Sequence, residues 1–232
     1  MRRSIVMALL VLAPSAASAQ QSVNFFVGGF TPRSAGARPG TDVLVNNLKP
    51  DPTNPNVLAF EVRDFNGAAF GGEWLVGLGN NFEAGVGASF YQRSVPSVNL
   101  KSVNANGAEI EQTLKLRLVP FTATFRFLPL GRHNSIEPYI GGGVGVLSWR
   151  YAESGDWVDA SKAIFQQTYT GSGSTTGPLF LGGIRVPIGS LGVGGEIRYQ
   201  AAEGTLPTDQ FFSGPKIDLG GMTYLFTIQV KF

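Results

Sequence analysis

Cysteine and histidine, two residue types that many enzymes use for catalysis, are scarce in this chain. It contains no cysteine and a single histidine, His133, in the stretch LGRHNS. A serine or cysteine nucleophile needs a base within hydrogen-bond reach, and histidine most often supplies that base. We expect His133 to lie in a turn and to be solvated. The sequence therefore predicts a protein that is not an enzyme, while a lysine or carboxylate mechanism stays open.

Metal and phosphate sites have equally little support. Without cysteine, and with one histidine, the chain lacks the ligands of a zinc or copper site. Oxygen ligands suited to calcium occur in one long loop, at Asp42, Asp51, Asn54 and Asn56. Their spacing is not that of an EF-hand, so we interpret them as solvated loop residues. The stretch GSGSTTG (171–177) lacks the Gly-Lys-Ser/Thr ending of a phosphate loop and reads as a flexible external linker. No cofactor is expected.

Charged residues that alternate with apolar residues or glycines form the one constellation with chemical content. They are Glu73, Glu83, Lys115, Arg117, Arg126, Arg185, Glu196, Arg198 and Lys231. In an extended strand, alternate side chains share one face, so these residues are predicted to line the lumen of a closed sheet. Paired charges would plug that lumen, whereas partly unpaired ones would line a narrow path that prefers anions. The presence of both signs favours the plugged lumen.

Extended segments must position these charges. In FEAGVGASFYQR the large apolar residues fall on one face of a strand from Phe82 to Phe90, and the closing residues 222–232 alternate in the same way. Similar segments recur along the chain, and we expect an all-β closed antiparallel barrel of about eight strands. The 31 glycines are compatible with twisted strands and would weaken a helical core.

The connections between these segments alternate between short and long. The short turns are predicted near 79–81, 128–135 and 187–190. The long segments, rich in Gly, Pro, Asn, Ser and Asp, are 31–67, 95–109, 152–175 and 203–215. Short turns at one end and long loops at the other are typical of an outer-membrane barrel. Residues 42–48 and 56–62 could add two strands, so ten strands is the alternative.

One segment breaks the alternation. Within residues 114–118 the leucines occupy even positions, whereas after Pro120 the large apolar residues occupy odd positions, with Arg126 between them. We predict a β-bulge at residues 119–120, because an extra residue shifts the faces by one and proline favours such a site.

The N-terminus indicates secretion. A basic start is followed by an apolar stretch, residues 5–13, and by the small residues Ala17 and Ala19. This pattern predicts a signal peptide over residues 1–19, cleaved after Ala19, and a single barrel domain over residues 20–232. Cleavage removes two arginines and leaves 16 basic and 16 acidic residues, so nothing favours nucleic acid as a partner.

The C-terminal stretch YLFTIQVKF resembles the insertion signal of bacterial outer-membrane barrels. The signal would map to Tyr224, Phe226, Ile228, Val230 and Phe232. PYIGGGVGV (138–146) and the layout over residues 23–232 are similar to the OmpA-like, OmpX-like and OmpW-like barrel families. The resemblance implies the outer membrane of a Gram-negative-type bacterium, contact with outer-membrane lipid, and recognition by the barrel-insertion machinery.

These observations predict a non-enzymatic barrel with a charged, plugged lumen and an interaction or envelope-structural role through its external loops. The alternative, which the OmpW-like resemblance implies, is a narrow channel or passive transporter for small solutes or hydrophobic molecules. A soluble periplasmic barrel that buries its apolar faces is a third interpretation. The external ligand or partner cannot be read from the loops, and an eight-stranded barrel is compatible with a monomer.

Overall fold

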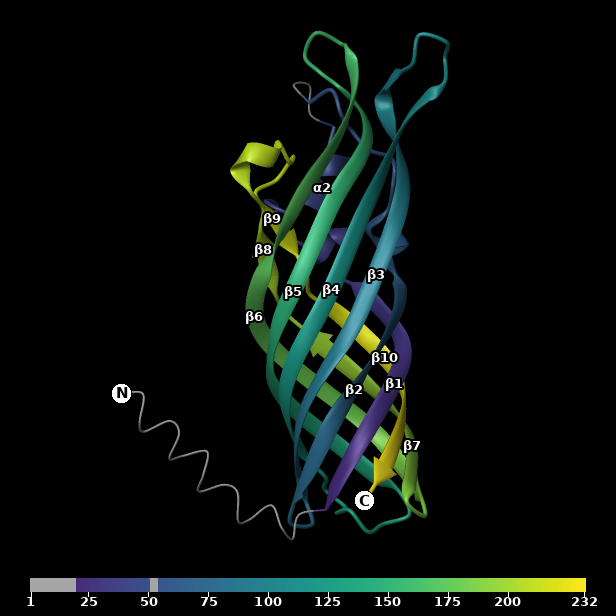
Figure 1. Ribbon diagram of the computed structural model, residues 1–232, viewed down its shortest axis with the longest axis vertical. Coiled ribbons are helices and arrows are strands. Elements are labelled where there is room, and N and C mark those ends of the chain that lie inside the picture. The colour runs from purple at the N-terminus through teal and green to yellow at the C-terminus, as the bar shows by residue number, and fades with distance from the viewer. Residues whose placement is uncertain (1–19, 51–53) are drawn as a thin grey trace, which may run out of the picture.

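A computed structural model describes residues 20–50 and 54–232. The predicted signal peptide, with Ala17 and Ala19, lies outside the described residues, as does Asp51. Eight long strands account for most of the chain (Figure 1). They are β1 (Gln21–Pro32), β2 (Gly67–Leu78), β3 (Phe82–Val103), β4 (Glu109–Phe127), β5 (Glu137–Val158), β6 (Ile164–Ile188), β7 (Leu191–Gln200) and β10 (Gly221–Lys231).

These strands form a closed antiparallel barrel in the order β1-β10-β7-β6-β5-β4-β3-β2. The last strand closes the ring by pairing with the first, from Pro32–Gly221 to Ser22–Lys231. The prediction of an eight-stranded barrel is therefore confirmed. The C-terminus lies at the same end as the short turns (Figure 1), which is the periplasmic end in barrels of this kind.

Four strands continue far beyond the others at the opposite, external end (Figure 1). β3 and β5 have 22 residues each and β6 has 25, whereas β7 has 10. β5 pairs with β6 along its whole length, from Glu137–Arg185 to Val158–Ile164. We call this part of β3, β4, β5 and β6 the external sheet.

The external sheet corrects two predicted loops and a predicted linker. Residues 95–109 and 152–175 are mostly strand, and the connections shrink to 104–108 and 159–163. Residues 171–177 lie within β6 and pair with β5 instead of forming a linker. Serine, threonine, glutamine and glycine are abundant here because the outer face of a strand beyond the membrane is in contact with water.

The two remaining long segments fold against the barrel. Residues 33–66 carry η2 (Ala35–Ala37), α2 (Val43–Leu48) and η3 (Val62–Phe65), and no strand of the barrel, so the ten-stranded alternative is wrong for the described residues. Residues 201–220 carry β8 (Glu203–Thr205), η4 (Thr208–Gln210) and β9 (Lys216–Asp218), with β8 paired to β9. Among the described residues, no helix has the length and apolarity needed to cross a membrane.

Apolar side chains cover the outside of the barrel on every strand. The exposed apolar residues include Phe25, Val27, Phe70, Trp74, Val86, Phe121, Phe125, Ile140, Val144, Val146, Phe180, Ile184, Val186, Ile197, Tyr224, Phe226 and Ile228. Exposed apolar patches on monomeric soluble proteins rarely exceed a few hundred Å². A continuous outward belt of Phe, Val, Ile and Leu matches the lipid-facing band of an outer-membrane barrel, and we call it the apolar band.

Along β4 the outward face changes from apolar to charged, although the hydrogen-bonded register with β5 does not shift. Its pairing with β5 runs unbroken from Gln112–Gly155 to Phe127–Ile140, so the predicted β-bulge at residues 119–120 is absent. Odd residues face outward throughout: Phe121 and Phe125 in the apolar band, Lys115 and Arg117 above it. The surroundings of the strand change from lipid to water, and its residues change accordingly.

Candidate functional site

The lower lumen contains a network of buried charges centred on Arg126. The Arg126 guanidinium forms ion pairs with Glu73 and with Glu196, the latter at 3.0 Å between Nη2 and Oε2. Arg198 also contacts both carboxylates, at 3.0 Å from Nη2 to Glu73 Oε2. The Tyr139 hydroxyl donates to Glu196 over 3.0 Å. Two arginines and two glutamates thus neutralise one another across β2, β4 and β7.

A second network lies nearer the periplasmic turns. Arg185 contacts Glu83 at 2.9 Å and Glu137 at 2.6 Å, and Lys231 contacts Glu137 at 3.2 Å. Arg132, from the turn after β4, approaches Glu83 to 3.6 Å. Together the two networks cross the lumen of a barrel that, at eight strands, has room for side chains and little else.

Glycines on the inward face make room for these charged side chains. A Cβ at Gly77 would lie 1.2 Å from Arg132 Nη1, and one at Gly85 would lie 2.6 Å from Glu73 Oε1. A larger residue at either position would require the charged side chain beside it to move, so glycine leaves the space that these charges occupy.

The predicted lumen charges are mostly, but not entirely, in the lumen. Glu73, Glu83, Arg126, Arg185, Glu196 and Arg198 are buried there and Lys231 is largely buried. The prediction is wrong for Lys115 and Arg117, whose side chains are exposed on the outside of β4. The sequence interpretation missed Arg132 and Glu137, since both lie at the edge of a turn, where alternation gives no signal.

Apolar residues replace charges in the upper lumen. A buried cluster joins the inward face of the external sheet, including Leu114, Leu116 and Tyr151, to Leu44 of α2 and Ile217 of β9. We call the parts of residues 33–66 and 201–220 that pack in this cluster the apolar insert. Asp42 anchors the apolar insert, because its carboxylate accepts hydrogen bonds from the amides of Leu44 and Val45 and pairs with Arg38 at 2.9 Å. Asp42 is fully buried, so the interpretation as a solvated loop residue is wrong.

Between the charged and apolar layers lies a small enclosed space of about 40 Å³. Phe26, Leu118, Leu147 and Leu225 line it, with Arg198 at its charged edge. This volume admits a few water molecules at most. Paired charges, this small space and the apolar cluster thus follow one another along the lumen.

A buried carboxyl group lies on the inner side of the external sheet. Glu153 Oε1 accepts from the Tyr151 hydroxyl at 2.7 Å and from Asn47 Nδ2 at 2.6 Å. Burial raises the pKa of Glu153 to about 7, against the opposing effect of these two donors. Glu153 borders a hollow of about 490 Å³ that also contacts Trp157, Tyr169 and the exposed Phe211.

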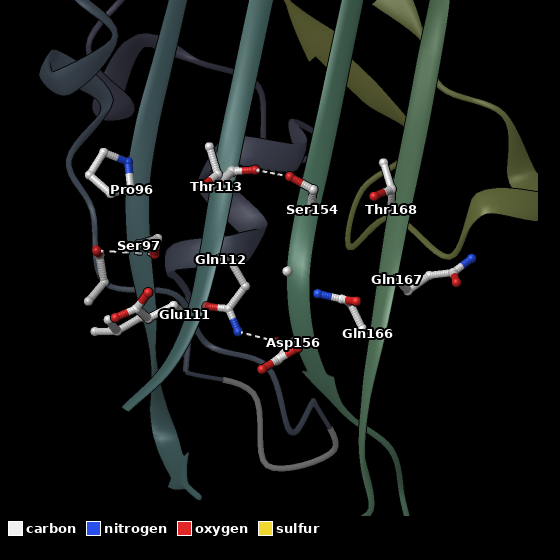
Figure 2. Close-up of a pocket in the computed structure, with 13 residues that line it drawn as sticks. Pro96, Ser97, Glu111, Gln112, Thr113, Ser154, Asp156, Gln166, Gln167 and Thr168 are labelled. Carbon is white, nitrogen blue, oxygen red and sulfur yellow. Dashed lines mark hydrogen bonds between the residues drawn. The ribbon is translucent and has the colours of Figure 1, made fainter. Parts of the chain in front are cut away.

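A polar groove of about 880 Å³ lies across the external sheet. Figure 2 shows its side chains arrayed over β3, β4, β5 and β6. Amide and hydroxyl groups dominate its lining, with carboxylates from Glu111 and Asp156, and none of the described lining residues is basic. Gln112 donates to the Asp156 carbonyl oxygen, while its own buried Oε1 accepts no hydrogen bond from the protein.

Gly155 shapes the centre of this groove. Its φ of 138° suits glycine, and a Cβ there would lie 2.3 Å from the Glu111 carbonyl oxygen. The spacing of polar residues in 152–175 could have indicated strands in this region. The abundance of turn-forming residues in the same segment instead favoured a loop.

The remaining predicted site residues are placed as follows. His133 is exposed in the turn after β4, as expected, with Nδ1 3.1 Å from Asn80 Oδ1. Asn56 is occupied by hydrogen bonds to Val158. Within residues 20–50 and 54–232, no group of three or more His, Cys, Asp or Glu side chains is arranged to hold a metal ion.

The C-terminal residues form the outward face of β10. Tyr224, Phe226, Ile228 and Phe232 are exposed and Val230 is partly exposed. Because these residues alternate with inward-facing ones, they form part of the apolar band. Recognition of this stretch by the insertion machinery stays a prediction.

The architecture matches solved outer-membrane barrels. The crystal structure of the outer membrane protein OprG from Pseudomonas aeruginosa has a TM-score of 0.51 and 11% identity, covering 92% of this chain and 96% of that chain. Neisserial surface protein A gives 0.45 and 11%, with coverage of 92% and 97%. Outer Membrane Protein W of E. coli gives 0.43 and 12%, with coverage of 93% and 100%. No protein-family model and no curated protein sequence matches this chain.

The likeness at these identities concerns the fold, and the surface of the molecule agrees with it. A closed barrel leaves no unpaired strand edge in lipid, and the apolar band surrounds the whole barrel. The chain is an integral outer-membrane β-barrel of the small, eight-stranded type.

Proposed function

We propose that this protein is a sealed, non-enzymatic barrel that presents its external sheet to a partner outside the cell. The observation that carries the proposal is the contrast between the two ends. The lumen is filled by paired charges and an apolar insert, whereas the large hollows lie on the external sheet. A rigid strand scaffold with an external recognition surface is the function that this distribution supports best.

The groove chemistry favours a neutral or cationic ligand that forms many hydrogen bonds. Glu111 and Asp156 give the groove a negative potential, and the lining residues supply no lysine or arginine to bind an anion. The unpartnered Gln112 Oε1 offers a buried acceptor to a ligand donor, and leaving such an atom unmatched is costly. A neutral or amino-bearing saccharide and an extended polar peptide both have this chemistry.

Binding measurements with the folded protein test this proposal. We expect surface plasmon resonance to show preference for neutral or cationic saccharides and peptides over anionic ones. An Asp156→Ala/Gln166→Ala variant should weaken that binding tenfold or more, because each lost hydrogen bond contributes about 1 kcal/mol and those to charged groups more. A Ser172→Ala/Ser174→Ala variant, also in β6, is the matched control. Preference for anionic ligands, or equal binding by both variants, would contradict the proposal.

The non-enzymatic part of the proposal is supported by the position of the single histidine. His133 lies among exposed residues of a periplasmic-end turn, with Asn80 as its hydrogen-bond neighbour. Among the described residues, the hydrogen bond that the ring forms is to the amide side chain of Asn80 and not to a serine or a carboxylate.

A narrow channel is the competing function, and the enclosed space beside Arg198 is the observation that favours it. Planar-bilayer recordings distinguish the two. We expect no regular conductance steps from the wild-type protein. A channel would give steps whose size changes in Arg198→Gln. Arg117, which lies outside the barrel wall, serves as the negative control through Arg117→Gln.

A further inference from the structure

Three basic side chains gather on the outside of the barrel wall just above the apolar band. Lys115 and Arg117 project from β4, and Arg150 projects from β5. Arg117 is paired in register with Arg150 on one side and with Gln92 of β3 on the other. These residues line a shallow outer hollow of about 260 Å³. We call Lys115, Arg117 and Arg150 the basic patch.

The basic patch lacks internal compensation. Among the described residues, none of its three cations forms an ion pair or a hydrogen bond with a carboxylate. The nearest acid along β5, Glu153, is buried on the opposite side of the sheet. Like charges directly opposite one another across two strands are destabilising, and Arg117 faces Arg150 in this way. An external anion would remove this repulsion.

The height of the basic patch identifies that anion. On β4, Phe121 of the apolar band lies four residues below Arg117, and on β5, Val146 lies four residues below Arg150. At about 3.3 Å per residue along a tilted strand, this distance leads from the hydrocarbon into the headgroup layer. Since all three side chains point away from the barrel axis just above the apolar band, they face lipid headgroups.

We propose that the basic patch binds the phosphate groups of outer-leaflet lipid headgroups. Arginine presents planar donors that match phosphate oxygens in pairs, and lysine adds a point charge. Arg117 and Arg150 lie side by side at one level, with Lys115 one position higher on the same face. Two arginines and a lysine thus clasp a phosphorylated headgroup while the apolar band below contacts its acyl chains.

Equilibrium binding of fluorescent lipid A to the detergent-folded protein tests the proposal. We expect lipid A carrying its phosphates to bind, and chemically dephosphorylated lipid A to bind much more weakly. Arg117→Gln/Arg150→Gln should lose about 30-fold in affinity, because each basic residue near an anionic lipid surface contributes roughly a fivefold factor. The control Lys49→Gln/Lys162→Gln removes two external cations far from the apolar band, and its affinity should stay within about twofold of wild type.

Three outcomes would overturn the proposal. They are equal affinity of the double variant and wild type, equal binding of dephosphorylated lipid A, and displacement of the lipid by inorganic phosphate alone, which would indicate a small-anion site. Folding of each variant is checked by its shift in gel migration on heating. Should the double variant fail to fold, raising the ionic strength must weaken wild-type binding if the contact is electrostatic; binding insensitive to salt also overturns the proposal.

Discussion

Arg126 illustrates how one residue joins the charges inside the barrel. Its guanidinium is completely buried between Glu73 and Glu196, and it stacks on the Tyr139 ring at 5.0 Å from the ring centroid. Buried charges are tolerated when paired, but removing one partner leaves the others uncompensated. The lower network is therefore a place where a single substitution has a large effect.

We predict that Arg126→Met lowers the free energy of unfolding by about 3–5 kcal/mol, since it leaves an excess of buried carboxylates. Urea unfolding followed by tryptophan fluorescence measures this change. Arg117→Met, an exposed arginine of the same strand, is the control and should change stability by less than about 0.5 kcal/mol. Equal losses in the two variants would show that Arg126 is not part of a buried network.

Glu153 makes the external half of the molecule sensitive to pH. Burial raises the pKa of this carboxyl from 4.5 to about 7, so the folded protein holds a proton that the unfolded chain releases. The unfolding free energy therefore falls as pH rises from about 4.5 to about 7 and is constant above that range. Burial raises the pKa of Asp218 as well, so a comparison with a variant is needed to isolate Glu153.

We predict that Glu153→Gln removes this slope while keeping an acceptor for Tyr151 and Asn47. The difference in unfolding free energy between variant and wild type should grow between pH 4.5 and pH 7, by at most about 3 kcal/mol. Urea titrations at a series of pH values measure it. Parallel pH profiles for the two proteins would rule out a perturbed Glu153.

At the scale of elements, α2 depends on Asp42 far more than a six-residue helix normally depends on its cap. Asp42 accepts from two helix amides, pairs with Arg38, and accepts from the amide of Asp218. Helices this short are not stable alone. The insert in the upper lumen is therefore held by Asp42, by the hydrogen bond from Asn47 to Glu153 and by its apolar contacts.

We predict that Asp42→Ala releases α2 from the lumen, because it removes the cap and leaves the buried Arg38 without its carboxylate partner. Hydrogen exchange at the amides of residues 43–48 should accelerate by 100-fold or more, corresponding to about 3 kcal/mol. Asp42→Asn, which keeps the cap but loses the charge, should have an intermediate effect. Unchanged exchange in Asp42→Ala would mean that apolar packing alone holds the helix.

The strand β4 shows what sequence alternation can and cannot predict. Alternation correctly predicted a strand, and the inward position of Arg126 follows from it. It failed for Lys115 and Arg117 because we assumed that the apolar face stays on one side. Above the apolar band, water lies outside and the apolar insert lies inside, so polarity reverses while the register continues. The alternation of polar and apolar residues does not show where the outer side of a strand passes from lipid to water.

The errors in the predicted bounds of the loops have a similar physical cause. Residues 171–177 have the composition of a linker, yet they pair with β5 over their whole length. Backbone hydrogen bonds hold a strand whether or not its side chains are apolar. Likewise, the lumen partners Arg132 and Glu137 follow from three-dimensional closeness at the barrel mouth and not from spacing along the chain.

For the molecule as a whole, the outer wall of the barrel has two different surroundings along its length. The lower half has lipid outside and paired charges inside, and the upper half has water outside and an apolar insert inside. The basic patch lies where the two halves meet. The sequence predicted the membrane half well, because the apolar band repeats on every strand, and it missed the external half.

The most direct test of this arrangement is a depth map of β4. The chain contains no cysteine, so single cysteines carrying a fluorophore can be placed at residues 115, 117, 121, 122, 123, 124 and 125 of protein folded in lipid vesicles. We predict quenching by a lipid-phase quencher at 121, 123 and 125, by an aqueous quencher at 115 and 117, and by neither at 122 and 124. Aqueous quenching at 121, 123 and 125, or a switch of the quenched parity at residues 119–120, would contradict the barrel as described.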